Sequence, residues 1–257
     1  RVRFKTNSPY ISIHAKMTNV GKMPHFAMTG SAGFDLYVKD KYVGTFVPPF
    51  DMNDGYEGII ELGSKREREI TINFPTYSDV LELYIGISKK ATLCAPNSYK
   101  IEKPIVFYGS SITQGGCASR AGSTYQGFVS RALDADYINL GFSGNARAEY
   151  EMAQYIKGLE MSAFVYDYDH NAPDAAHLEK THEKFFLRIR ENNPDLPIVI
   201  MTKPDFDYDP FASQRRDVIY KTYHNALSRG DKNVYFISGK DLMKHAKNDG
   251  TVDDCHP

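Results

Sequence analysis

The sequence has no tryptophan, only three cysteines and no long apolar run. Cys94, Cys117 and Cys255 are scattered and form no CxxC pair, so they predict neither a zinc site nor a disulfide framework. At most one disulfide is possible, which slightly favours a reducing, cytoplasmic-type compartment. No segment approaches the roughly 20 apolar residues that a membrane-spanning helix needs, so we expect no membrane partner.

Neither sign of charge is in excess. The chain carries 31 Lys and Arg against 32 Asp and Glu, for a formal net charge of -1. A nucleic-acid partner requires a basic surface that displaces counterions, so we expect none. The hydrophobic content of 42% over 257 residues is typical of a globular protein with one large domain or two modest ones. The 18 tyrosines are compatible with a carbohydrate ligand.

The first hundred residues read as short strands separated by Gly, Pro, Asn and Asp. Apolar residues alternate with a period of about two at residues 10–17, 33–38, 42–46, 69–74 and 81–87. No helical periodicity of useful length accompanies them. We therefore predict a small all-β sandwich domain over residues 1–100, followed by a linker at residues 95–103.

From Pro104 onward, strands alternate with amphipathic helices. The predicted strands are residues 105–108, 136–140, 162–166, 197–201 and 233–237, and the predicted helices are residues 125–133, 148–159, 175–192 and 214–229. This alternation predicts an α/β domain over residues 104–257, with a flavodoxin-like, doubly wound parallel sheet covered on both faces. Ligands bind at the carboxyl ends of such strands, where we expect Ser111, Gly144 and Asn171 to lie on one rim.

Three short segments carry residues for acyl transfer. Gly109-Ser110-Ser111 follows an apolar strand, a second turn runs over residues 139–145, and Asp253-x-x-His256 closes the sequence. A serine on a tight turn exposes its hydroxyl, and an aspartate can orient a histidine that removes the hydroxyl proton. Taken in this order, the segments indicate a serine acyl-transfer site.

These segments resemble the conserved blocks of the SGNH hydrolases, the GDSL-type esterase superfamily. Ser110 stands where the name-giving aspartate often occurs. The third block usually reads Gly-x-Asn-Asp, and residues 166–173 depart from it because they contain no glycine and no aspartate after Asn171. The resemblance implies that Ser111 is the nucleophile, His256 the general base and Asp253 its partner. It also implies an oxyanion hole formed by the N–H groups of Ser111 and Gly144 and by the amide of Asn171.

A second resemblance lies in the first half, where residues 31–37 (Ser-Ala-Gly-Phe-Asp-Leu-Tyr) match a Gly-x-Asp-Leu-Tyr motif. This motif names a small domain that precedes one branch of these esterases. We expect this domain to contribute a substrate wall through Met23, His25, Phe26 and Tyr37, although a purely structural cap explains its strands equally well. Family members continue past the Asp-x-x-His block, so we also expect the hydrolase domain to be truncated at its C-terminal end.

The expected function is hydrolysis of small acyl esters, acetyl esters first, plausibly on a saccharide. Two alternatives remain open: an acyltransferase that uses the same site, and an inactive glycan-binding protein. We expect no cofactor, and the oligomeric state is open.

We expect no metal either, because two acidic runs that resemble calcium loops lack the required glycine. Ala172 replaces it after Asp167-x-Asp169-x-Asn171, and Pro210 replaces it after Asp205-x-Asp207-x-Asp209. His177 and His182 do not have a zinc-binding spacing and are predicted to lie on a helix surface.

Overall fold

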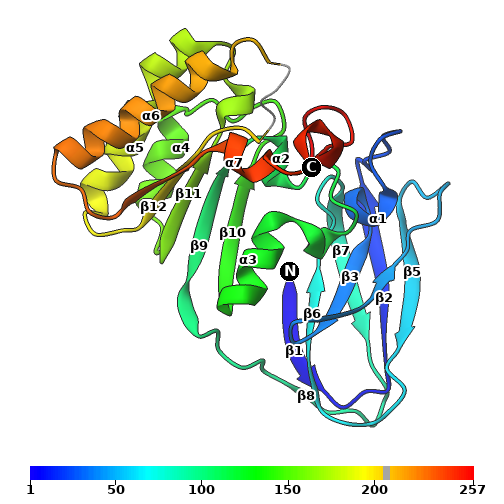
Figure 1. The fold of residues 1–257 in the computed structure, drawn as a ribbon. Coiled ribbons are helices and arrows are strands. Elements are labelled where there is room, and N and C mark those ends of the chain that lie inside the picture. The colour runs from blue at the N-terminus through cyan, green and yellow to red at the C-terminus, as the bar shows by residue number, and fades with distance from the viewer. Residues whose placement is uncertain (205–208) are drawn as a thin grey trace. The chain divides into compact units, whose positions relative to one another are not determined.

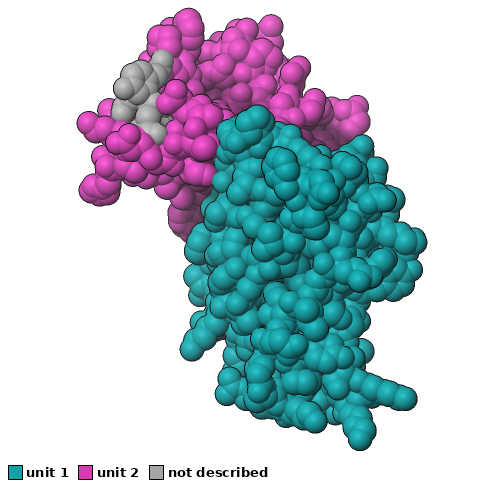
Figure 2. Space-filling view, turned by 90° about the vertical axis from the view of Figure 1, so that its right-hand side faces the viewer, with its two compact units in different colours: residues 1–99, 115–132 teal, residues 100–114, 133–257 magenta. Residues whose placement is uncertain are grey.

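The structure is a computed structural model that describes residues 1–204 and 209–257. The chain forms two compact units, residues 1–99 with 115–132 and residues 100–114 with 133–257 (Figure 2). The predicted boundary had left residues 115–132 in the second half, but they group with the first. The predicted linker also ends too late, because strand β9 already begins at Ile101. The domain assignment itself stays a prediction.

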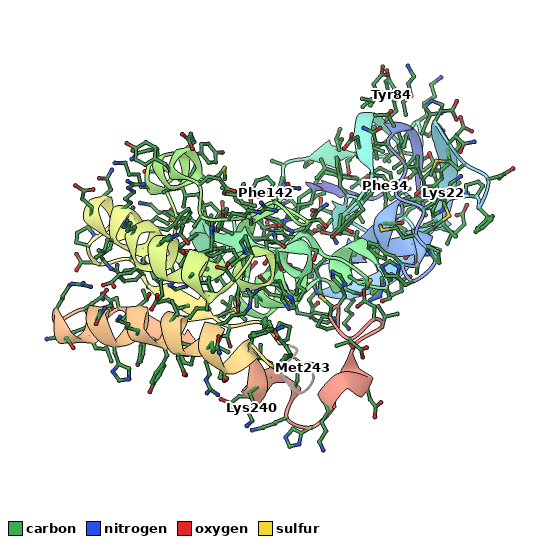
Figure 3. The ribbon with its side chains drawn as sticks, turned by 90° about the horizontal axis from the view of Figure 1, so that it is seen from above. Lys22, Phe34, Tyr84, Phe142, Lys240 and Met243 are labelled. Carbon is green, nitrogen blue, oxygen red and sulfur yellow. The ribbon has the colours of Figure 1, made fainter. Side chains whose placement is uncertain are left out.

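The first unit contains two antiparallel sheets, which confirms the all-β character predicted for this half. Three of its strands were not predicted: β1 (Val2–Thr6), β5 (Gly55–Glu61) and β8 (Leu93–Cys94). One sheet has the order β4 (Lys41–Phe46), β3 (Phe34–Val38), β6 (Arg68–Asn73), β1 (Val2–Thr6) and β8 (Leu93–Cys94), and the other has the order β5 (Gly55–Glu61), β2 (Tyr10–Thr18) and β7 (Asp79–Gly86). Alternate residues of both sheets, including Ile11, Phe34 and Ile70, form a single buried core. Phe34 and Tyr84 are labelled in Figure 3, where Tyr84 marks the exposed side of β7.

The Gly-x-Asp-Leu-Tyr motif explains why residues 115–132 belong to the first unit. Asp35 on β3 is fully buried and accepts hydrogen bonds from Asn73 Nδ2 at 2.8 Å and from the Gly122 N–H at 2.7 Å. Helix α3 (Tyr125–Leu133) sends Arg131 to the Gly122 carbonyl at 2.8 Å and over the Tyr37 ring at 4.5 Å. A buried carboxylate needs such donors, so the motif fixes the segment in place.

The second unit contains a five-stranded, wholly parallel sheet, as predicted. Its order is β10 (Ala135–Gly141), β9 (Ile101–Gly109), β11 (Ala163–Asp167), β12 (Ile198–Met201) and β13 (Val234–Ile237). This is the flavodoxin-like strand order, and it confirms the predicted fold class.

Three helices, α4 (Tyr150–Lys157), α5 (Ala175–Asn192) and α6 (Ala212–Ser228), lie along one face of this sheet (Figure 1). Their buried residues join alternate residues of β9, β11 and β12 in one core. Helix α5 begins at the predicted residue because the Asp174 carboxylate caps the His177 N–H at 2.7 Å. On the opposite face of edge strand β13, Tyr235 and Ile237 remain 49% and 38% exposed.

The register of the sheet creates the rim expected from the sequence. Gly141 of β10 lies opposite Gly109 of β9, which lies opposite Asp167 of β11. The three loops that carry Ser111, Gly144 and Asn171 therefore leave neighbouring strands at the same level. Within the described ranges, no helix is both long and apolar enough to cross a bilayer.

Candidate active site

Ser111 begins the one-turn helix α2 (Ser111–Gln114), directly after β9. Ser110 Oγ accepts the Ile112 N–H at 3.2 Å, and the Ser110 N–H donates to the Asp167 carbonyl at 3.0 Å. Ser110 is fully buried, whereas Ser111 is partly exposed. The first serine therefore holds the turn, and the second presents its hydroxyl at the surface of the unit.

His256 and Asp253 share one tight turn near the end of the chain. His256 Nε2 lies 2.7 Å from Ser111 Oγ, and His256 Nδ1 lies 2.8 Å from Asp253 Oδ2. The other Asp253 oxygen accepts the N–H groups of Cys255 and His256 at 3.2 and 2.8 Å. Partial burial opposes ionisation of Asp253, but these hydrogen bonds outweigh it and lower its pKa. The aspartate is therefore ionised at neutral pH and can only accept hydrogen bonds from the ring.

The turn at residues 139–145 is hydrogen-bonded to the nucleophile helix. Gln114 Oε1 accepts the Ser143 N–H at 2.8 Å, and a Cβ added at Gly141 would come within 2.0 Å of the Gln114 nitrogen. Gly144 has a φ of +69°, which L-residues rarely adopt, and its N–H has no hydrogen-bond partner among the described residues. This turn can offer a backbone donor beside Ser111.

Asn171 ends the 3₁₀ helix η2 (Asp169–Asn171), and its Nδ2 donates to the Phe142 carbonyl at 2.8 Å. Arg215 on α6 holds this segment from behind. Its guanidinium donates to the carbonyls of Asp169 and Ala172, each at 2.9 Å, and lies 3.5 Å from the Asp169 carboxylate. The amide side chain therefore stands on a fixed segment beside the turn that carries Gly144.

A second carboxylate lies under the nucleophile helix. Asp167, the last residue of β11, accepts the Thr113 hydroxyl at 3.3 Å through Oδ2, while Oδ1 is buried and has no partner in the described part of the chain. Burial, followed by the nearby charge of Asp169, raises the Asp167 pKa to about 7. Its position suits structural support of the turn, since its contact is with Thr113.

The comparisons with known families identify the chain. Residues 102–257 match the model of the GDSL-like lipase/acylhydrolase family. The chain belongs to that family. Residues 1–93 match a second family, GxDLY, described as the N-terminus of SGNH-hydrolase-type esterases, so the predicted branch is confirmed as well. This acylhydrolase is therefore an ester hydrolase of the GDSL/SGNH type.

Several solved structures have a fold similar to that of this chain. A GDSL-like lipase-family protein from Bacteroides ovatus ATCC 8483 is 27% identical, with a TM-score of 0.89 over 99% of this chain and 77% of its own. The salicylyl-acyltransferase SsfX3 from a tetracycline biosynthetic pathway is 20% identical, with a TM-score of 0.73 over 93% and 70% of the chains. A family two carbohydrate esterase from Clostridium thermocellum, solved with cellohexaose, is 16% identical, with a TM-score of 0.64 over 92% and 80%. The comparison with curated proteins finds no match.

The structure of this acylhydrolase brings Ser111, His256 and Asp253 into hydrogen-bond contact, and it places Asn171 against the turn that holds Gly144. The four candidates for a substrate wall lie in the first unit. Met23 and His25 are partly or fully exposed, whereas Phe26 and Tyr37 are buried in that unit's own packing, with Phe26 against Tyr77 and Tyr37 against Tyr42. Their role in substrate binding stays a prediction.

The prediction for His182 is wrong. Its ring is buried, stacks on Tyr166 at 4.5 Å and lies 2.9 Å from Thr222 Oγ1, because residue 182 continues the apolar stripe of α5 that includes Leu178 and Phe185. Gln114 and Arg215, which support the two loops of the site, were not singled out. Gln114 has a sequence signal, since it lies in the same helical turn as Ser111. Arg215 has none, because an arginine on an amphipathic helix ordinarily faces water.

The acidic run at residues 167–171 is divided between different partners in this acylhydrolase. Asp167 contacts Thr113, whereas Asp169 accepts the Lys203 N–H at 3.1 Å and pairs with Arg215. A backbone N–H and a guanidinium thus already serve the second carboxylate. In the other acidic run, Asp205 and Asp207 lie outside the described residues, while Asp209 forms an ion pair with Lys203.

Proposed function

We propose that this acylhydrolase is a serine esterase that releases small acyl groups, acetyl in the first instance, from a saccharide through an acyl-enzyme. The observation that carries the proposal is the continuous hydrogen-bond chain from Ser111 Oγ through the His256 ring to Asp253. Both links measure less than 3 Å, the range in which a histidine can accept a hydroxyl proton.

The lowered Asp253 pKa supports one arrangement of the protons. An ionised carboxylate can only accept, so the His256 proton sits on Nδ1 and leaves Nε2 as the base. Nε2 takes the proton of Ser111 Oγ as this oxygen attacks the ester carbonyl, and the resulting imidazolium then protonates the departing alcohol. Water repeats the sequence on the acyl-enzyme, releases the acid and regenerates the serine.

The negative oxygen of each tetrahedral intermediate requires donors that are already in place. We assign them as the backbone N–H groups of Ser111 and Gly144 and the Nδ2 of Asn171, whose amide has a second hydrogen beyond the one that Phe142 accepts. A donor of this kind typically contributes about 10²–10³ in rate. The Gln114–Ser143 hydrogen bond supports this assignment because it ties the Gly144 turn to the helix of the nucleophile.

The saccharide part of the proposal draws on the relatives. The C. thermocellum carbohydrate esterase was solved with cellohexaose, and it shares the fold of this chain. Phe142, on the same turn as Gly144, is 38% exposed and offers an aromatic surface of the kind that sugar rings stack on (Figure 3).

Hydrolysis of a chromogenic acetyl ester and of acetylated oligosaccharides tests the two parts separately. Ser111→Ala should remove nearly all activity toward both without lowering the unfolding temperature. Ser119→Ala, a matched change at an exposed serine, should leave activity unchanged. Full activity in Ser111→Ala would contradict the proposal, and turnover of the aryl ester alone would restrict the failure to the saccharide.

A second candidate, acyl transfer to an alcohol, is favoured by the likeness to the salicylyl-acyltransferase. Both reactions share the acyl-enzyme and differ in whether water or an alcohol accepts the acyl group. Adding alcohols to the ester assay and measuring the ratio of acid to new ester separates them. An acid yield that does not change with alcohol concentration would leave hydrolysis as the function.

A further inference from the structure

In the sequence, Cys255 lies between the candidate general base, His256, and its carboxylate partner, Asp253. Its Sγ is 3.6 Å from Nδ1 of His170, a distance within hydrogen-bond range for sulfur. Several hydrogen bonds lie within this turn: Asp253 accepts the N–H groups of Cys255 and His256, and the Val252 N–H donates to the His256 carbonyl at 2.9 Å. The thiol contact leaves the turn, as does the contact of His256 with Ser111.

His170 is a fixed partner for this thiol. Burial first, and then the nearby basic groups Lys203, His256 and Arg215, lower its pKa to about 3, so the ring is neutral at pH 7 and can accept a thiol proton. Its Nε2 is buried with no partner in the described part of the chain. This ring therefore does not shuttle protons to solvent, and its contact with the turn of the base is through Cys255.

The segment that carries His170 is the one that carries Asn171. Arg215 holds it by the carbonyls of Asp169 and Ala172, and the Lys203 N–H holds the Asp169 carboxylate. His170 and Asn171 are adjacent in one short 3₁₀ helix, so the same contacts hold the backbone of both residues. The Cys255–His170 contact thus connects the turn of the base to the segment of the amide donor.

We propose that Cys255, through His170, is a positioning residue that sets the orientation of His256 against Ser111. The inference rests on the proposed function, since it assumes that His256 is the base. The thiol forms no bond with the substrate. It holds the turn so that His256 Nε2 stays within reach of Ser111 Oγ while Asn171 stays beside the Gly144 turn. The competing view is that Cys255 only fills space.

The rate at which a fluorophosphonate labels Ser111 tests this directly, because labelling needs the base but no deacylation. Four variants are compared with the wild-type chain: Cys255→Ser, Cys255→Ala, His170→Phe and the double variant with Ala and Phe. Loss of one hydrogen bond corresponds to roughly fivefold in rate. We expect about a fivefold decrease for Cys255→Ala and for His170→Phe, no further decrease in the double variant, and at most about a threefold decrease for Cys255→Ser. With a chromogenic acetyl ester, kcat should fall and KM should hold.

A reversible modification covers the case in which a variant fails to fold. In a Cys94→Ser, Cys117→Ser background, methyl methanethiosulfonate converts the Cys255 thiolate to a methyl disulfide, and methanesulfinate leaves while the thiol proton passes to buffer. We expect labelling of Ser111 to slow at least fivefold and to recover fully with dithiothreitol. The same chain with Cys255→Ala should not respond to the reagent.

The outcomes separate the two proposals. Labelling at the wild-type rate in the Ala and Phe variants and in the modified chain, with or without a lower unfolding temperature, would show that Cys255 only fills space. Labelling that follows the expected pattern without turnover of any ester would overturn the proposed function and leave the inference standing. A wild-type chain whose Ser111 does not react would overturn both.

Discussion

Asp167→Asn should change how stability depends on pH. The buried carboxyl ionises near pH 7 in the folded chain, whereas its ordinary value is 3.8. Between these values the folded state holds a proton that the unfolded state has released. The free energy of unfolding therefore falls as pH rises from about 4 to about 7 and levels off above that. The whole change corresponds to at most about 4 kcal/mol, at 1.36 kcal/mol for each pH unit between the two values.

Asparagine cannot ionise, so the variant should lack this slope. Its carbonyl can still accept the Thr113 hydroxyl, but its NH₂ takes the place of Oδ1, which has no partner in the described residues. That buried donor costs about 1–3 kcal/mol at every pH. We therefore expect the variant to be less stable than the wild type near pH 4 and to equal or exceed it above pH 7.

Urea unfolding followed by circular dichroism at half-unit steps from pH 4.5 to pH 8 measures both curves. Asp195→Asn, a change at an exposed carboxylate in a loop, is the matched control and should run parallel to the wild type. Parallel curves for Asp167→Asn and the wild type would show that Asp167 is not protonated in the folded chain at pH 5–6, and would refute the reasoning.

Two further changes test the loops of the site. Asn171→Ala should lower kcat by about 10²-fold or more with little change in KM, because the amide is assigned to the charge that develops in the transition state; an equal loss of binding and of turnover would point to a role in ground-state contacts instead. Arg215→Met should destabilise the chain by about 3 kcal/mol in urea unfolding, because it leaves the Asp169 carboxylate buried without its partner. Adding Asp169→Asn should restore part of that loss, and the idea fails if the double variant is the least stable.

Much of the architecture follows from patterns in the sequence. Strand–helix alternation predicts the parallel sheet, and the amphipathic run at residues 175–192 predicts α5 at its observed bounds. The location of residues 115–132 could not be predicted, because it depends on a hydrogen bond between Asp35 and Gly122, 87 residues apart. Periodicity reports only local structure and contains no information about such a pair.

The same distinction between local patterns and long-range contacts applies to the residues of the site. Ser111 and Gly144 stand on turns with recognisable local chemistry, and the order of the blocks predicts their rim. Residues that act through a distant contact have no local signal. Arg215 reads as a solvent-facing helix residue, and the His170–Cys255 contact joins positions 85 apart.

The division of the chain into units also constrains how it can be synthesised and cut. The first unit needs residues 115–132, so it cannot be complete on the ribosome until the segment with Ser111 has already emerged. The second unit needs the segment around His256, since His256 contacts Ser111. A protease cut near residue 100 would thus release no intact first unit, because Gly122, the partner of Asp35, would remain on the other fragment. The first unit of this acylhydrolase thus depends on residues 115–132, which follow the beginning of the second unit at residue 100.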